Sequence, residues 1–155
     1  MSDAPVAAFS SVDDLVDAVG TTLGHSSWHP LNQSTVDTFA DLVDDHQWIH
    51  VDAARAAEGP YGGTIVHGML TLALIPTMIS EVVAVEGLRM GLNYGFDRVR
   101  FIQPVPVGSR VRAAIAVAEA KPTDDGVRTS FEATVERDGS ADPVCVARNV
   151  ILYLR

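Results

Sequence analysis

The spacing of hydrophobic residues divides the chain into a helical first half and a strand-rich second half. Intervals of three and four residues predict a short amphipathic helix over 11–19, a second helix over 34–43 that Ser34 caps, and a brief one over 53–57. A longer helix is expected over 66–83. It carries no charge as far as Ser80, so it is hydrophobic on every face and is expected to be buried within the protein.

Beyond this helix, hydrophobic and polar residues mostly alternate, which predicts strands over 91–103, 109–118, 127–137 and 144–154. A shorter strand, limited by Pro30, is expected over 26–31. Helices first and strands last, with short connections, favour an α+β fold with an antiparallel sheet. Because only one helix is hydrophobic all round, we expect the sheet to wrap around it. Long strands also leave exposed edges, which favours pairing with a second copy of the chain.

The length of 155 residues suits one domain with one core, which we expect to span residues 1–155, with residues 1–24 as an N-terminal helical extension. The net charge of −9 disfavours nucleic acid or an anionic membrane as a partner, since both are negatively charged. The charge-free stretch at 59–80 is broken by Gly and Pro. Its apolar part, about 15 residues, is short for a bilayer span.

The cysteine content and the N-terminal residues together indicate a cytoplasmic protein. Cys145 is the one cysteine, so no internal disulfide can form, which fits a reducing compartment. The first 15 residues show neither a basic region nor a long apolar segment, so no signal peptide is expected. Cys145 lies in a strand-like run, where we expect a buried, unreactive thiol.

The densest group of chemically active side chains is DDHQWIH, residues 44–50, and three interpretations compete for it. His46 and His50 would share one face of a helix and could bind a metal, although Gln47 stands where zinc proteases have their glutamate. Alternatively, His46 faces solvent and His50 is a satisfied core or capping residue. In the third interpretation, Asp45 and His50 lie across a non-helical turn and converge on one water molecule for acid–base chemistry. The spacing alone leaves all three open.

Gly68, in IVHGML near the start of the charge-free helix, is a second candidate. Backbone N–H groups at a helix N-terminus are free donors, and the helix dipole favours negative charge there. A glycine also lets a ligand approach the backbone closely. Such a donor suits a carbonyl oxygen that gains charge in a transition state. Tight packing between helix and sheet is an equally good reason for a glycine at this position.

Several segments resemble the MaoC-like family of (R)-specific enoyl-CoA hydratases and dehydratases. They are FADLVDDHQWIH at 39–50, AARAA at 53–57 and GGTIVHGML at 62–70. The stretch NYGFDRVRFIQPVPVGSRVR at 93–112 is similar to the family's strand, turn and strand. The resemblance covers the chain from about Ser34 to its C-terminus. It implies the hot-dog fold, in which an antiparallel sheet wraps around one long central helix.

The resemblance implies a hydro-lyase of the enoyl-CoA hydratase 2 type in fatty acid metabolism. Such an enzyme adds water to a trans-2-enoyl-CoA to give an (R)-3-hydroxyacyl-CoA, or runs the reverse reaction. Asp45 and His50 fall on the family's catalytic positions, and Gly68 falls on the glycine whose N–H forms the oxyanion hole. Substrate contacts are expected at Trp48, Met69, Asn93 and Tyr94. An acyl-CoA thioester is the expected substrate. No metal or other cofactor is implied, and a homodimer is expected.

The sequence departs from the family's motif beside the catalytic aspartate. Asp44 replaces the usual Gly, and Gln47-Trp48 replace Asn-Pro. We expect Asp44 to point into solvent and the changes to affect the shape of the pocket rather than to abolish activity. Two other functions stay open, namely a hot-dog acyl-CoA thioesterase and a non-catalytic acyl-thioester-binding subunit. The presence of both Asp45 and His50 argues against each of them.

Overall fold

The computed structural model describes residues 7–155, so residues 1–6 of the expected N-terminal extension lie outside the described part of the chain. The helices are α1 Asp14–Asp17, α2 Gln33–Val43, α3 Trp48–Val51, α4 Ala53–Ala57 and α5 Gly68–Val82. The strands are β1 Ala7–Phe9, β2 Thr22–His25, β3 His29–Leu31, β4 Val83–Val85, β5 Met90–Phe101, β6 Ser109–Thr123, β7 Gly126–Arg137 and β8 Pro143–Leu154.

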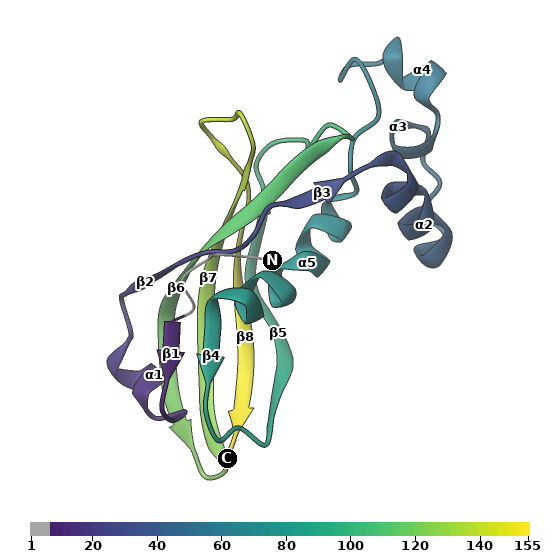
Figure 1. The fold of residues 1–155 in the computed structure, drawn as a ribbon. Helices are drawn as coiled ribbons and strands as arrows, with labels where there is room; N and C mark the ends of the chain where they lie inside the picture. Colours follow the sequence, from purple (N-terminus) through teal and green to yellow (C-terminus); the bar gives the residue numbers. More distant parts are fainter. Residues whose placement is uncertain (1–6) are drawn as a thin grey trace.

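The larger of two sheets has six strands in the order β2-β6-β7-β8-β5, with β3 also paired to β6 (Figure 1). All of its pairings are antiparallel. β1 and β4 form a separate parallel pair. Only Asp124 and Asp125 separate β6 from β7, so the turn between these long strands is tight. β5 is an edge strand of the described sheet, with β8 as its one neighbour.

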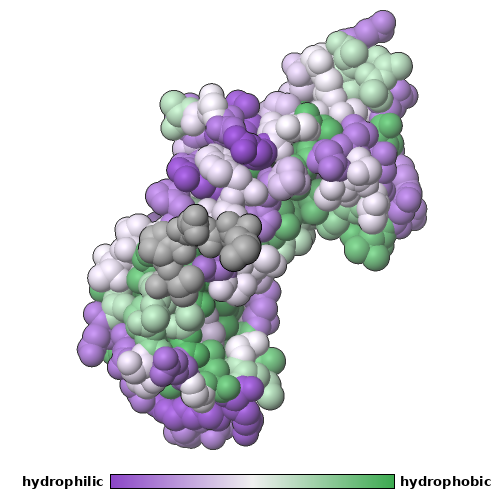
Figure 2. Space-filling model, in the orientation of Figure 1, coloured by the Kyte–Doolittle hydropathy of each residue, from purple (hydrophilic) through white to green (hydrophobic). Residues whose placement is uncertain are grey.

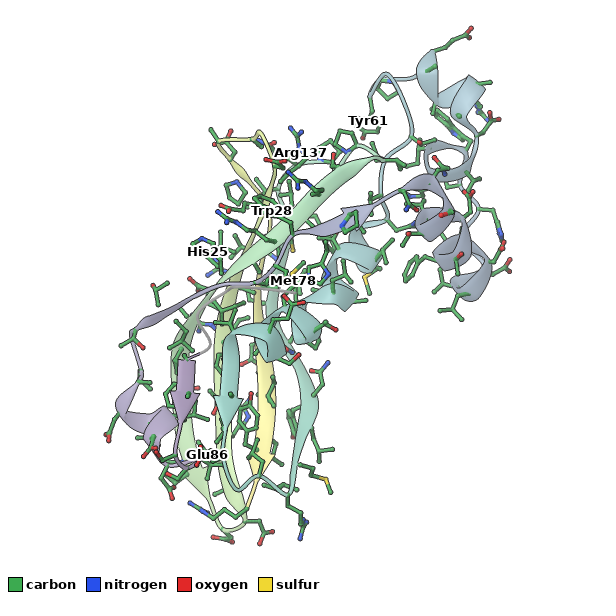
Figure 3. All side chains as sticks on the ribbon, in the orientation of Figure 1. His25, Trp28, Tyr61, Met78, Glu86 and Arg137 are labelled. Atoms are coloured by element: carbon green, nitrogen blue, oxygen red, sulfur yellow. The ribbon has the colours of Figure 1, made fainter. Side chains whose placement is uncertain are left out.

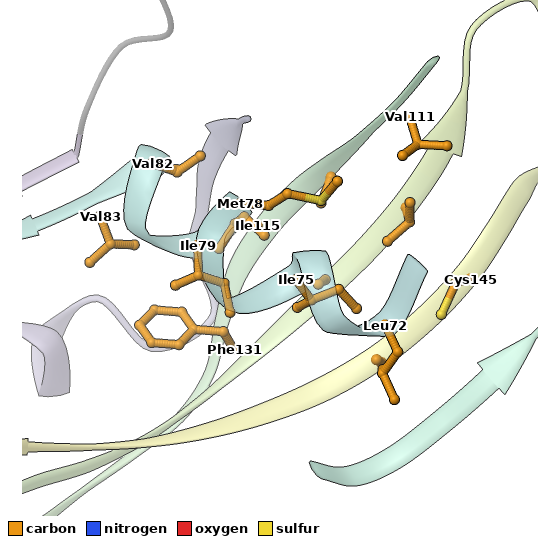
Figure 4. Packing of buried hydrophobic residues seen from close by; sticks show 14 of the residues in the cluster. Leu72, Ile75, Met78, Ile79, Val82, Val83, Val111, Ile115, Phe131 and Cys145 are labelled. Carbon is orange, nitrogen blue, oxygen red and sulfur yellow. The ribbon is translucent and has the colours of Figure 1, made fainter. Parts of the chain in front are cut away.

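Helix α5 packs against the inner face of this sheet and supplies the centre of the core (Figures 1 and 4). Its side chains Ile75, Met78 and Ile79 are completely buried. The strands contribute buried residues such as Ile115 and Phe131 to the same hydrophobic cluster. Burying one side chain of this size contributes about 1.5–3 kcal/mol. The helix buries most of its hydrophobic residues against the sheet, but Met69, Ala73 and Thr77 are exposed along its other side, so the expected burial on every face is only partly met.

The segment between β3 and α5, residues 33–64, forms a lobe that projects beyond one end of the sheet (Figure 1). Helix α2 buries Val36 and Ala40, and it exposes polar residues along most of its length and Leu42 and Val43 at its end. Hydrophobic surface gathers over α2 and along the junction between the lobe and the sheet (Figure 2). The chain passes through the whole lobe before α5 begins at Gly68, which brings residues 44–50 back toward the start of that helix.

The α+β architecture and the four long strands are as predicted, because the alternation of residues and the uniform hydrophobicity of α5 are strong local signals. Several details of the prediction are wrong. The helix expected over 11–19 is only α1, since the Asp14 carboxylate accepts the Ser11 N–H before the helix begins. The cap of α2 is Asn32, whose side chain accepts the Thr35 N–H, rather than Ser34. His50 lies in the short helix α3, not in a non-helical turn.

Cys145 is buried in β8, as predicted, and burial raises the pKa of its thiol to about 11. A thiol with such a pKa stays protonated and unreactive at neutral pH. Among the helices of residues 7–155, none has the length and hydrophobicity needed to cross a bilayer.

Candidate active site

Asp45 follows directly on the C-terminal cap of α2. The cap is Asp44, whose backbone is left-handed with φ of 57°. The backbone N–H groups of Asp44 and Asp45 both donate to the Ala40 carbonyl, so the chain reverses sharply at this point. The Asp44 side chain is 99% exposed, as expected. The reversal sends the Asp45 side chain, which is 52% exposed, toward the start of α5 instead.

His50 is 7% exposed and its ring is held by a backbone carbonyl. Nδ1 lies 2.6 Å from the Ile65 oxygen. Because a carbonyl can only accept, the hydrogen of a neutral ring must be on Nδ1, which leaves the Nε2 lone pair free to accept a proton. Burial lowers the pKa of His50 from its ordinary value of 6.5, the Ile65 hydrogen bond opposes this, and His67 adds to the lowering. The imidazole is therefore neutral at pH 7, as a general base must be.

Further hydrogen bonds connect α3 to the strand-like segment before α5. The Ile65 N–H donates to the Ile49 carbonyl, so Ile65 and the residue pair 49–50 exchange two hydrogen bonds. The Gln33 amide donates to the His50 carbonyl at 2.8 Å, and its oxygen accepts the Thr64 hydroxyl at 2.7 Å. These polar contacts fix the backbone of His50 from both sides.

His67 completes a compact group with Asp45 and His50. It is 3% exposed, and its ring stacks on that of His50 with centroids 3.8 Å apart and planes 24° from parallel. His67 Nε2 lies 3.0 Å from the Asp45 backbone oxygen and 3.9 Å from a carboxylate oxygen of Asp45. Phe39 covers the imidazole at 5.1 Å. Three side chains from three segments of the chain thus meet beside the α5 N-terminus.

Gly68 is the first residue of α5, with His67 as the N-cap. Within residues 7–155, neither the Gly68 nor the Met69 N–H donates to a backbone carbonyl. A Cβ at position 68 would lie 3.1 Å from the Phe101 ring, which therefore packs directly over the glycine. The Gly68 position thus combines a free donor at the positive end of a 15-residue helix with close packing on its other side.

Two pockets meet at His50 and Gly68. One, of about 300 Å³, is lined by Tyr61, Thr71 and Phe101 among others. Tyr61 lies on the loop that leads back from the lobe (Figure 3). The other, also of about 300 Å³, is lined by Phe39, Val43, Asp45, His67 and Met69. Both have more apolar than polar lining, and each includes His50 and Gly68. A ligand lying across the junction would present its middle to these two residues.

The structure brings together some of the predicted site residues but not all. Asp45, His50, Gly68 and Met69 line the same pocket. Trp48 lies on the far side of α3, where its ring packs on Gly59 and beneath the Arg55 guanidinium at 4.5 Å. Asn93 lines a different pocket between α5 and the β5 edge. Tyr94 is 69% exposed on β5, so these last three lie outside the pockets around His50 in this chain.

The arrangement of nitrogen and oxygen atoms around His50 favours proton transfer over metal binding. Ligand atoms of Asp45, His50 and His67 all lie within 4.8 Å of one another, which is a spacing a metal can use. However, His67 Nε2 is engaged with the Asp45 carbonyl and His67 Nδ1 is buried, so His67 offers no free, accessible nitrogen to an ion beside Asp45 and His50. His46, the other predicted metal ligand, is exposed and pairs with Asp41.

Sequence reasoning missed the role of residues that act through tertiary contacts. His67 was given no chemistry, although its place next to Gly68 put it at the same helix end. Gln33 and Phe101 carry no motif that indicates a site. Among the basic side chains of the described residues, those of Arg110, Arg112 and Lys121 are paired with carboxylates. Within the described chain, Arg89, Arg98 and Arg100 have no carboxylate at ion-pair distance.

Comparison with known proteins adds independent evidence. Residues 14–139 match the family model described as the MaoC like domain. The chain is 47% identical over 147 residues to "3-hydroxyacyl-thioester dehydratase Z" of Mycobacterium tuberculosis strain H37Rv, covering 94% of this chain and 97% of that protein. Among solved structures, "R-Hydratase PhaJ1" of Pseudomonas aeruginosa superposes with a TM-score of 0.74 at 26% identity, covering 88% of this chain and 82% of that one.

A second structure, the "(R)-hydratase from A. caviae involved in PHA biosynthesis", superposes with a TM-score of 0.71 at 25% identity, covering 86% of this chain and 95% of that one. The fold that these structures share is the hot-dog fold, with its sheet wrapped around the equivalent of α5. On the family model, the sequence identity and the fold together, this chain belongs to the MaoC-like family of hydratases and dehydratases.

Proposed function

We propose that this protein is an (R)-specific enoyl-CoA hydratase that adds water to a trans-2-enoyl-CoA and also catalyses the reverse dehydration. The observation that carries the proposal is the convergence of Asp45, His50 and the free Gly68 N–H where two apolar pockets meet. A thioester and its α,β double bond would lie at this junction. The relative named as a 3-hydroxyacyl-thioester dehydratase supports the same class of reaction.

In the proposed mechanism, Asp45 and His50 bind one water molecule and activate it. His50 Nε2 is the free nitrogen of a neutral imidazole, because Nδ1 donates to Ile65. The Asp45 carboxylate is exposed enough to meet water and lies in the same pocket. Water attacks C3 of the enoyl group as one of its protons passes to His50 Nε2, and the Asp45–His50 pair returns one proton to C2 from the same side. The reaction is redox-neutral and uses no metal or other cofactor.

The Gly68 N–H serves as the proposed oxyanion hole. As water adds to C3, charge develops on the thioester oxygen, and a donor already fixed at a helix N-terminus stabilises that charge without reorganising. The dipole of α5 acts in the same direction. The pocket below Tyr61 and Phe101 and the pocket below Phe39 and Met69 would hold the two arms of the substrate on either side of the thioester.

We further propose that the protein is a cytoplasmic homodimer that pairs through β5. This edge strand exposes Met90, Leu92 and Tyr94, and its outer backbone groups have no partner strand within residues 7–155. An apolar edge of this kind is prone to associate unless a second copy covers it. The single buried cysteine suits a reducing compartment.

Sedimentation of wild type and two lysine variants tests the dimer. Leu92→Lys places a charge on the proposed interface, and Val19→Lys does so at an equally exposed position outside β5, with exposed fractions of 46% and 44%. We expect wild type and Val19→Lys to sediment at twice the 16.5 kDa chain mass and Leu92→Lys to shift toward the monomer. A wild-type monomer at micromolar concentration would contradict the proposed pairing.

Loss of the enoyl-thioester absorbance of crotonyl-CoA tests the hydration reaction. Asp45→Asn and His50→Gln each remove one proton-transfer group, so we expect kcat to fall by about 10²–10⁴-fold. Asp44→Asn is the matched control, since it removes a neighbouring carboxylate that faces solvent. Wild type should yield the (R)-alcohol without free thiol. Free thiol would establish a thioesterase instead, and no turnover of short or long enoyl-CoAs would favour a binding subunit; either result overturns the proposal.

The oxyanion role of Gly68 is tested by a pair of substitutions that share a Cβ. Proline is favoured at the first position of a helix, and His67 already has the extended backbone, ψ of 131°, that a residue before proline needs. Gly68→Pro therefore removes the N–H with little strain in the helix, whereas Gly68→Ala retains it. We expect Gly68→Pro to lower kcat by about 10²–10³-fold relative to Gly68→Ala. Equal kcat values in the two variants would show that this donor does not act on the transition state.

The pH dependence of kcat/KM reports the protonation of His50. The active form has a neutral imidazole, and burial lowers the His50 pKa below 6.5. The midpoint of the acidic limb should therefore lie below pH 6.5. His46→Gln serves as the control, because His46 is exposed and its pKa is raised by the Asp41 hydrogen bond. An acidic limb centred above pH 6.5, or one that moves in His46→Gln, would exclude His50 as the base.

A further inference from the structure

We propose that His67 is a positioning residue, which holds the Asp45 backbone and the His50 ring in the arrangement that hydration requires. This inference rests on the proposed function. Its basis is that one buried side chain contacts both proton-transfer groups and is bonded through the backbone to Gly68. Nothing else in the described chain connects all three.

The first contact is a hydrogen bond between segments that lie 22 residues apart. The Asp45 carbonyl can only accept, so His67 Nε2 must carry the hydrogen and donate it. This fixes the tautomer and leaves Nδ1 as a lone pair, and Nδ1 is buried without a partner among the described residues. The Nε2–H of His67 thus satisfies the Asp45 carbonyl. Without this N–H, the carbonyl is left unpaired at the junction of lobe and helix.

The second contact is the stack on His50. The Ile65 hydrogen bond fixes one nitrogen of the His50 ring but still allows the ring to tilt about that bond. His67 lies 3.8 Å beneath it and nearly parallel, while Phe39 supports His67 in turn. The stack therefore sets the plane of the His50 ring and with it the direction of the Nε2 lone pair.

His67 lines the pocket but offers no free, accessible nitrogen to the reacting atoms in this arrangement. Its Nε2 is engaged with Asp45, its Nδ1 is shielded from solvent, and the residue as a whole is 3% exposed. It acts through Asp45 and His50 instead. Among the described residues, the Asp45 carboxylate accepts one long hydrogen bond, of 3.4 Å from the Gln47 N–H, and lies 3.9 Å from His67 Nε2, so its placement depends on that of its backbone.

Two variants separate the hydrogen bond from the packing. His67→Phe keeps an aromatic ring to stack on His50 but lacks the N–H, and His67→Gln provides an amide N–H at a similar reach but cannot stack. We expect His67→Phe to lower kcat for crotonyl-CoA hydration by about 10–100-fold with little change in KM, since misplacing a catalytic group by about 1 Å costs this much. His67→Gln keeps the hydrogen bond but loses the stack, so its kcat should also fall, by less than that of His67→Phe because the Ile65 hydrogen bond still holds the His50 ring.

A second readout does not depend on activity. Hydrogen exchange of the backbone amides in residues 41–50, measured by mass spectrometry, should be faster in His67→Phe than in wild type and close to wild type in His67→Gln. Thermal unfolding of both variants checks that the fold is retained.

Three results would overturn the inference: a His67→Phe variant with the kcat of wild type, equal losses in both variants, or unchanged exchange in residues 41–50. A wild-type protein without hydratase activity would instead contradict the proposed function, and the exchange measurement would still decide whether His67 positions Asp45.

Discussion

The hydrogen bond from His50 Nδ1 to the Ile65 carbonyl is the contact on which the chemistry of the site depends. It determines which nitrogen of the imidazole carries the hydrogen and therefore which one can take a proton from water. It also joins the lobe to the segment that leads into α5. A carbonyl oxygen can only accept a hydrogen bond, so it pairs with the tautomer that carries its hydrogen on Nδ1 and not with the other tautomer. Burial strengthens the preference for this tautomer. A donor or acceptor left unpaired at this buried position would have no water to bond to.

The backbone at Asp44 imposes a second constraint. The chain reaches Asp45 only by leaving α2 through a left-handed residue, and glycine adopts this conformation without a steric cost. The resemblance to the MaoC-like family places a glycine at this position, and this chain has Asp. Aspartate is among the few other residues that tolerate positive φ. The left-handed conformation explains both why the family usually has glycine at this position and why this chain can have Asp44 there instead. The Asp44 carboxylate is solvated as a consequence of its backbone and has no evident part in the chemistry.

The sequence predicted the body of the fold better than the site. The strands β5–β8 and helix α5 carry strong periodic signals over a dozen or more residues, so they were located from sequence alone. Helix α3 is too short to show a period, and in the sequence NQST either Asn32 or Ser34 could cap α2, so local patterns could not settle these details. Asp45 and His50 were proposed through a motif. The part played by His67 was not accessible, because its neighbours Phe39, Asp45 and His50 come from distant segments and only the folded chain reveals them.

The structure places the site outside the main core, and this separates stability from function. Helix α5 and the sheet bury most of the large hydrophobic side chains, whereas the lobe buries Ala40 and Ala56 and contributes Val36 to the main core. The active-site segment of the lobe is held largely by polar contacts of Gln33, His50 and His67. Such buried polar contacts are directional, so they specify one arrangement more strictly than apolar packing does. The core can therefore tolerate changes that preserve its volume. The proposed site depends instead on a small set of hydrogen bonds, and we expect the loss of any one of them to move Asp45 or His50 without unfolding the protein.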